Sequence, residues 1–247
     1  MKHRRLPCAF FGALFLFASI GLAQADSPKW VETYNRLLGK YDTAAGVKYS
    51  AWKADAADMK AIQQVVDDIA KEKPSSLGKN EKLAFYLNAY NAWILHEALG
   101  KYPTKSVKDL LFTFFTQPRI TVAGERMSFN HLEKDVIRGQ FHDPRIHFAL
   151  NCASRSCPPL NPRAFRGDQL EKQLDRLATA FVNSKKGVDY IEQKKEAELS
   201  AIFKWYADDF KAGGGAVAFI NKRRHPPLPN DTKISYQDYD WSLNEAK

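Results

Sequence analysis

Apolar residues recur at three- and four-residue intervals along much of this chain, which is the spacing of an amphipathic helix. Trp30, Tyr34 and Leu37 follow this spacing after Pro28, and proline is favoured in the first turn of a helix. With the start and stop residues that flank each apolar stretch, the pattern predicts six helices. The first starts at residue 28, and the others cover 56–73, 81–99, 131–138, 169–181 and 201–210.

The segment 81–99 differs from the other predicted helices, because its apolar residues lie on nearly every side. Such a helix is expected at the centre of a fold rather than on its surface. Asn88 and Asn91, three residues apart, nevertheless share one face of it. Since a buried carboxamide is costly without partners, we expect both to be hydrogen-bonded to the segment around residues 147–156.

Shorter segments with alternating apolar and polar residues predict strands. Residues 119–129 are typical of a hairpin, and 145–151 of a strand that places His147 and Cys152 on opposite faces. Further strands are expected at 188–191, 197–199 and 234–241. Because these elements lack a regular β-α-β rhythm, the predicted fold class is α+β, a helix-rich single domain around a small, mostly antiparallel sheet with a buried central helix.

The first 25 residues have the three parts of a secretory signal peptide. A basic start with Lys2, Arg4 and Arg5 precedes an apolar run over 9–22, and Ala23-Gln24-Ala25 is an A-x-A cleavage site. We expect residues 1–25 to be removed, which leaves a single globular domain over 26–247. The mature chain has no second long apolar segment, so we expect no transmembrane anchor and a periplasmic or secreted location.

Export predicts that the mature protein begins at Asp26. Mass spectrometry of the periplasmic or secreted form is expected to give this N-terminus, because an A-x-A site directs cleavage to the bond after its second alanine. A cytoplasmic protein that still carries Met1 would contradict this expectation.

Charge and residue spacing narrow the classes of partner and cofactor. Three positive charges of the net +9 lie in the signal segment, and the remaining basic residues are spread out apart from Lys222-Arg223-Arg224. This favours an anionic envelope setting over nucleic-acid binding, without identifying the envelope substrate or partner. The histidines show neither H-x-x-x-H nor H-x-H spacing and no C-x-x-C is present, so we expect no metal site and no cofactor.

Reactive side chains concentrate in the segment 147–160, where an apolar stretch runs into a loop that ends in prolines. His147, Cys152 and Cys157 are the components of a thiol site, in which a thiolate attacks an acyl carbon and an imidazole carries the proton. Cys157 precedes Pro158-Pro159 on a stiff turn that can fold back over the face of His147. We therefore prefer Cys157 as the nucleophile and Cys152 as a packed thiol or resolving partner.

A catalytic imidazole also needs a carboxylate or carboxamide to orient it, and the orienting group need not be near in sequence. Asn88, Asn91 and Glu133 are the candidates for this role. The aromatic residues Trp205, Tyr206 and Trp241 are expected in the core, and Asp209 at a helix end or in a loop pair.

Two classes of function stay open. The first is a thiol-dependent hydrolase or acyltransferase that acts on amide or peptide substrates. The second is a non-catalytic envelope domain for binding or interaction, pinned by a Cys152–Cys157 disulfide, with His147 as a satisfied core histidine. A redox-active cysteine pair is a third alternative. Counting free thiols before and after reduction separates these alternatives.

Five blocks of sequence carry a resemblance to a known family. They are FYLNAYN at 85–91, DPRIHFALNC at 143–152, SCPPL at 156–160, LSAIFKW at 199–205 followed by Asp209-Phe210, and YDWSLN at 239–244. In this order they resemble the bacterial family called domain of unknown function 547, over nearly all of the mature chain. The resemblance implies a fold and an exported bacterial context but no settled activity. This chain has Glu133-Lys134 where the family tends to have Glu-His, so no role for that histidine is carried over.

Overall fold

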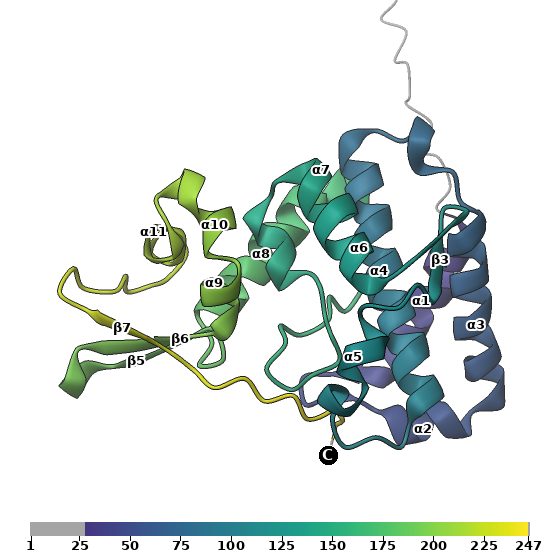
Figure 1. The fold of residues 1–247 in the computed structure, drawn as a ribbon, viewed down its shortest axis with the longest axis horizontal. Helices are drawn as coiled ribbons and strands as arrows, with labels where there is room; N and C mark the ends of the chain where they lie inside the picture. The colour runs from purple at the N-terminus through teal and green to yellow at the C-terminus, as the bar shows by residue number, and fades with distance from the viewer. Residues whose placement is uncertain (1–27, 247) are drawn as a thin grey trace, which may run out of the picture.

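A long helix through the middle of the molecule organises the fold. Helix α4 (Lys79–Lys101) lies among the other helices of one half of the molecule, and fourteen of its residues are buried (Figure 1). Its apolar side chains face every direction, so neighbours on all sides take them out of water. The prediction of a buried central helix is confirmed.

The computed structural model describes residues 28–246, and the expected signal peptide at 1–25 lies outside the described residues. Among the described residues, no helix is both long and apolar enough to cross a membrane. Around α4 the first half of the molecule is built from further helices. They are α1 (Lys29–Tyr41), α2 (Tyr49–Ala54), α3 (Ala56–Lys71), α5 (Leu111–Phe114), α6 (Phe129–His131), α7 (Gly139–Phe141) and α8 (Leu170–Val182).

Within residues 28–246 the strands form three small sheets, where a single small sheet was predicted. Strand β1 (Asp42–Thr43) pairs with β2 (Gly46–Val47), and β3 (Ile120–Val122) pairs with β4 (Glu125–Met127) in the expected hairpin. The third sheet has the order β5-β6-β7 and is antiparallel except between its last two strands. Its strands are β5 (Val188–Ile191), β6 (Glu196–Leu199) and β7 (Lys233–Tyr236). The chain is thus a helix-rich α+β domain, as predicted.

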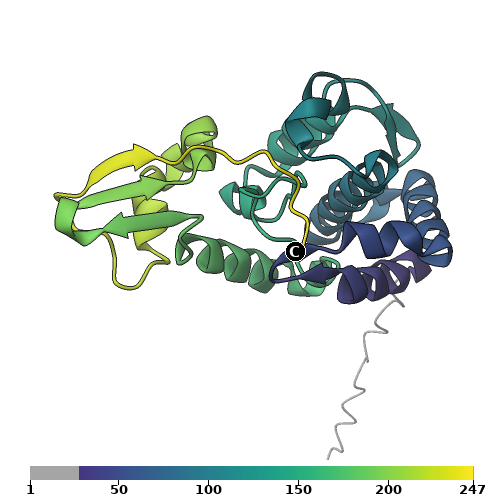
Figure 2. The same ribbon diagram turned by 90° about the horizontal axis from the view of Figure 1, so that it is seen from below.

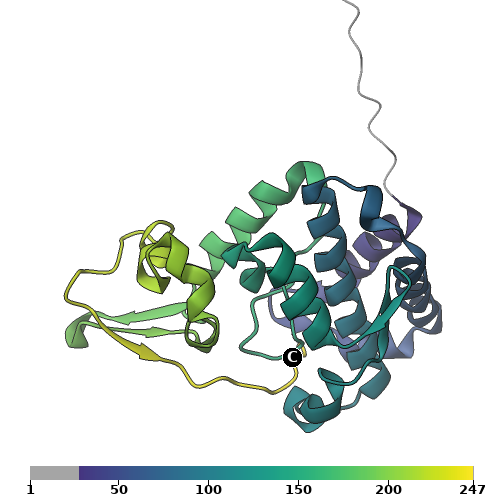
Figure 3. The same cartoon turned by 45° about the horizontal axis from the view of Figure 1, so that its top comes forward.

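The three-stranded sheet and three short helices form the end of the molecule away from α1–α3 (Figures 1 and 3). The helices are α9 (Ala201–Trp205), α10 (Ala207–Phe210) and α11 (Ala216–Asn221). Helix α8 leads from the first half toward this end (Figure 2).

The last residues of the chain return from this end to the helical half. Strand β7 stops at Tyr236, earlier than predicted, and residues 237–246 run back across the molecule (Figure 2). We call residues 237–246 the C-terminal strap. The strap makes backbone bridges from Leu243 to Ser154 and from Glu245 to Val47, so it fastens the loop after residue 151 to the N-terminal half.

The predicted strand at 145–151 is wrong. Residues Pro144–Phe148 form a 3₁₀ helix, because the Asp143 carboxylate accepts a hydrogen bond from the backbone N–H of Arg145 and Pro144 occupies the first helical position. These start signals outweigh the weak alternation of apolar residues. His147 and Cys152 therefore do not lie on opposite faces of a strand.

A candidate thiol site

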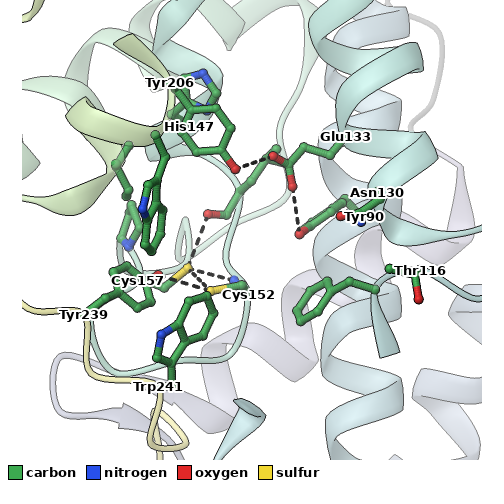
Figure 4. Close-up of a pocket in the computed structure, with 15 residues that line it drawn as sticks. Tyr90, Thr116, Asn130, Glu133, His147, Cys152, Cys157, Tyr206, Tyr239 and Trp241 are labelled. Atoms are coloured by element: carbon green, nitrogen blue, oxygen red, sulfur yellow. Dashed lines mark hydrogen bonds between the residues drawn. The ribbon is translucent and has the colours of Figure 1, made fainter. Parts of the chain in front are cut away.

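A cavity of about 270 Å³ brings together four of the six predicted site residues (Figure 4). His147, Cys152, Cys157 and Glu133 all line it, whereas Asn88 and Asn91 do not. The remaining wall is mostly aromatic or apolar. It consists of Tyr90, Phe115, Thr116, Asn130, Leu150, Pro158, Ile202, Trp205, Tyr206, Tyr239 and Trp241.

The two cysteines lie on a short loop that is held from both sides. Asn151, which is buried, accepts a hydrogen bond from the N–H of Ala153 and donates to the carbonyl of Pro158, so it ties the loop's two ends together. From the other side, the strap accepts a backbone hydrogen bond from Arg155 at Ser242. A loop fixed in this way can present a side chain in a defined direction.

The sulfur of Cys152 is surrounded by groups that can donate hydrogen bonds to it. Its Sγ atom lies 2.6 Å from Sγ of Cys157, 3.1 Å from Oγ of Ser154 and 3.3 Å from the hydroxyl of Tyr239. Both cysteines are free thiols, so the disulfide of the second alternative is not present in the structure. The hydrogen bonds of Asn151 and of the strap hold the loop instead.

The pKa values of the two thiols are shifted in opposite directions. The hydrogen bond from Cys157, helped by those from Ser154 and Tyr239, lowers the pKa of Cys152 to about 7. Burial raises the pKa of Cys157 well above its ordinary value, and its hydrogen bond to the Cys152 sulfur acts in the same direction. Cys152 is half-buried and Cys157 is buried. The preference for Cys157 as the nucleophile is therefore not supported, and Cys152 has the properties expected of a reactive thiol.

Tyr239 and Ser154 complete the surroundings of the Cys152 sulfur. The Ser154 hydroxyl has a single proton, and it lies 3.0 Å from the Tyr239 hydroxyl, to which it can donate in place of the Cys152 sulfur. Burial, together with the neighbouring sulfurs, raises the pKa of Tyr239 far above its ordinary value, so this phenol stays protonated and available as a donor. Neither residue was predicted as part of the site. Tyr239 lies 87 positions beyond Cys152 in the chain, whereas Ser154 is only two positions away.

His147 is oriented by a carboxylate, but by none of the expected groups. Its Nε2 atom lies 2.6 Å from Oδ2 of Asp209. Arg138 donates two hydrogen bonds of 2.8 Å to the same carboxylate. The hydrogen bonds of His147 and Arg138 lower the pKa of Asp209. The His147 ring also stacks on Tyr206, with 3.9 Å between ring centres. Among the described hydrogen bonds, none joins His147 to either sulfur.

The two central asparagines are structural. Asn91 donates to the carbonyl of Ala149 at 2.8 Å and accepts from the N–H of Asn151 at 2.9 Å, as expected for a polar tie to the segment that leads into the cysteine loop. Asn88 is also buried, but its two hydrogen bonds go to the backbone of Phe165 and not to the expected segment. Neither asparagine contacts His147.

Replacing Asn91 with Leu is expected to destabilise the protein by about 1–3 kcal/mol, because it leaves a buried N–H and a buried carbonyl without partners. Urea unfolding of the variant and of the parent protein measures this difference. Gln64→Leu is a suitable control, since Gln64 is exposed and bonds only to Asp68. Equal stability of the Asn91 variant and the parent would contradict the assignment.

Glu133 lies across the cavity from the sulfurs (Figure 4). It sits on a π-helix (Leu132–Arg138), a rare conformation that is frequent at functional sites. Two phenols hold its carboxylate: the Tyr206 hydroxyl donates to Oε1 at 2.6 Å and the Tyr90 hydroxyl to Oε2 at 3.4 Å. Burial raises the pKa of both tyrosines, so both remain donors.

Three aromatic residues that pack against one another border the sulfurs. Trp205 stacks on Trp241 with 5.8 Å between ring centres, and Tyr239 packs against both. Trp205 is 49% exposed, so the expectation that it belongs to the core is wrong. An exposed ring stack at a cavity is a surface on which a ligand can pack.

No three His, Cys, Asp or Glu side chains in the described part of the chain are grouped as the ligands of a metal ion would be.

Comparison with known proteins supports the sequence resemblance over the middle of the chain, but not over the blocks at 199–205 and 239–244. A family model described as "Protein of unknown function, DUF547" matches residues 74–182, which span α4, the π-helix, the cysteine loop and α8. This part of the chain is therefore a domain of that family. The match stops before Tyr206, Asp209 and Tyr239, so the site is completed by residues beyond it. Neither the search of curated proteins nor that of solved structures found a match.

Proposed function

We propose that this protein is a thiol-dependent acyl-transfer enzyme, a hydrolase or transferase of amide or related acyl substrates, with Cys152 as its nucleophile. The observation that carries the proposal is the half-buried Cys152 sulfur at the wall of a cavity, within hydrogen-bond reach of three donor groups. Because its pKa is lowered, Cys152 is thiolate at neutral pH to a greater extent than an ordinary thiol.

In the proposed reaction the Cys152 thiolate attacks the acyl carbon, which forms a carbon–sulfur bond and places negative charge on the acyl oxygen. Collapse of this intermediate breaks the bond to the leaving group, which takes its proton from solvent water. In hydrolysis the hydroxide formed attacks the thioester and releases the Cys152 thiolate; in transfer it takes the proton of the acceptor, which attacks instead. The Tyr239 phenol, whose pKa is raised, keeps its proton and serves as a hydrogen-bond donor at the sulfur.

His147 then has a different role from the one expected of it. Because it is bonded to Asp209 and stacked on Tyr206, it acts as a positioning residue for the wall that carries Glu133. A catalytic dyad of His147 with a cysteine is not part of the proposal.

The release of p-nitrophenol from p-nitrophenyl acetate tests the proposal. A burst of about one equivalent per protein, followed by slower turnover, is expected because the acetyl group first accumulates on the thiol. Cys152→Ala should abolish the burst. Cys157→Ala should keep it at a lower rate, since the variant loses only one hydrogen bond to the thiolate. An undiminished burst in Cys152→Ala would refute Cys152 as the nucleophile.

We further propose that the enzyme acts outside the bacterial cytoplasm, on a substrate of the cell envelope. This location rests on the signal-peptide pattern of residues 1–25.

A further inference from the structure

The wall opposite the sulfurs has the features of a site for a cation. We propose that Glu133 and the surrounding aromatic rings bind a primary ammonium group, so that the acyl substrates of this enzyme carry a cationic amine. This inference rests on the proposed function and adds the class of substrate to it.

The Glu133 carboxylate is fixed in place but not saturated. Each of its oxygens accepts one hydrogen bond from a tyrosine, and each carboxylate oxygen has two lone pairs. An acceptor site therefore remains on each oxygen, on a half-buried side chain that lines the cavity. An ammonium group has three N–H donors and no acceptor, which complements this arrangement.

The charge around the cavity also favours a cation. Its fifteen lining residues include Glu133 but no lysine or arginine. The nearby guanidinium of Arg138 interacts electrostatically with Glu133, but its two hydrogen bonds go to the carboxylate of Asp209, which balances its charge. When Cys152 is a thiolate, the cavity gains a second negative charge. An anionic substrate would be repelled, and a cationic one attracted.

The shape and lining of the cavity set the kind of cation. At about 270 Å³ it accommodates a group of side-chain size rather than a large ligand. Aromatic faces attract ammonium ions and also pack against the alkyl chain that carries them. Six of the lining residues are aromatic: Tyr90, Phe115, Trp205, Tyr206, Tyr239 and Trp241. An ammonium on a short alkyl chain, as in lysine or a diamine, fits this combination.

Calorimetric titration with n-pentylamine, and with 1-pentanol as its neutral counterpart, tests the inference. The parent protein is expected to bind pentylamine at least tenfold more tightly than pentanol. Glu133→Gln should remove this preference. Asp135→Asn should keep it, because Asp135 is an exposed carboxylate of the same π-helix that pairs with His131 outside the cavity. The proposal would be overturned if the parent protein did not bind pentylamine. It would also be overturned if Glu133→Gln preferred pentylamine over pentanol as strongly as the parent does.

The same titration on Cys152→Ala separates this inference from the proposed function, because ammonium binding does not need the reactive thiol. Retained binding in Cys152→Ala is expected. Binding that depends on Cys152 instead of Glu133 would place the cation at the thiolate and overturn the assignment to Glu133. Amine binding without an acetyl burst would refute only the proposed acyl transfer. A burst without amine binding would refute only the proposed substrate class.

Discussion

Alkylation of the native protein by iodoacetamide near pH 7 is expected to occur almost entirely at Cys152, and Cys152→Ala should slow it by more than tenfold. Only the thiolate reacts, and the pKa of Cys152 is lowered to about 7 while that of buried Cys157 is raised. The rate should therefore rise with pH around a midpoint near 7. Peptide mapping after brief labelling identifies the alkylated residue.

Tyr239→Phe provides the matched control for this result. The phenol stands 3.3 Å from the Cys152 sulfur, and its removal takes one stabilising hydrogen bond from the thiolate. The midpoint of the alkylation profile should move to higher pH while the labelled residue stays the same. Preferential labelling of Cys157, or a midpoint near 8.5 in the parent protein, would contradict the acid strengths assigned to the two thiols.

Asp209→Ala is expected to produce the largest loss of stability, about 3 kcal/mol. The Asp209 carboxylate is the partner of both Arg138 and His147, and the His147 side chain is only 2% exposed. The variant leaves these two groups without their acceptor. Asp208→Ala is the matched control, because its neighbouring carboxylate is 81% exposed and pairs only with Lys211. Urea unfolding should show little change in the control, and equal losses in the two variants would contradict the role of Asp209.

The loss of unfolding free energy caused by Asp209→Ala should depend on pH. The pKa of Asp209 is lowered in the folded protein, so its contribution to stability is fully present above the unfolded carboxyl pKa of about 4. It is lost progressively as the pH falls below that value toward the folded pKa. The difference in unfolding free energy between the parent and the variant should thus shrink between pH 5 and pH 3. A difference that grows on acidification would contradict this sign.

Much of the fold follows from local sequence patterns. Helices α4 and α8, the β3–β4 hairpin and strands β5 and β6 lie where periodicity and turn residues predict them. The error at 144–148 is also local in origin: Asp143 and Pro144 are helix-start signals, and they prevail over a short alternation of apolar residues.

The site could be predicted only in part, because its decisive contacts are distant in sequence. The segment with His147 and both cysteines is evident from its composition. The partner of His147, in contrast, lies 62 residues away at Asp209, and the strap brings Tyr239 to Cys152. The order of thiol reactivity depends on burial and on these donors, so spacing alone favoured Cys157 over Cys152.

The most direct test of Cys152 as the nucleophile is to locate the covalent adduct that forms with p-nitrophenyl acetate. Peptide mapping of acid-quenched protein identifies the residue that carries it. Acyl transfer at this site predicts an acetyl group on Cys152 of the parent protein and of Glu133→Gln, and none in Cys152→Ala. An acetyl group found only on Cys157, or on lysines alone, would contradict the assignment of Cys152 as the nucleophile.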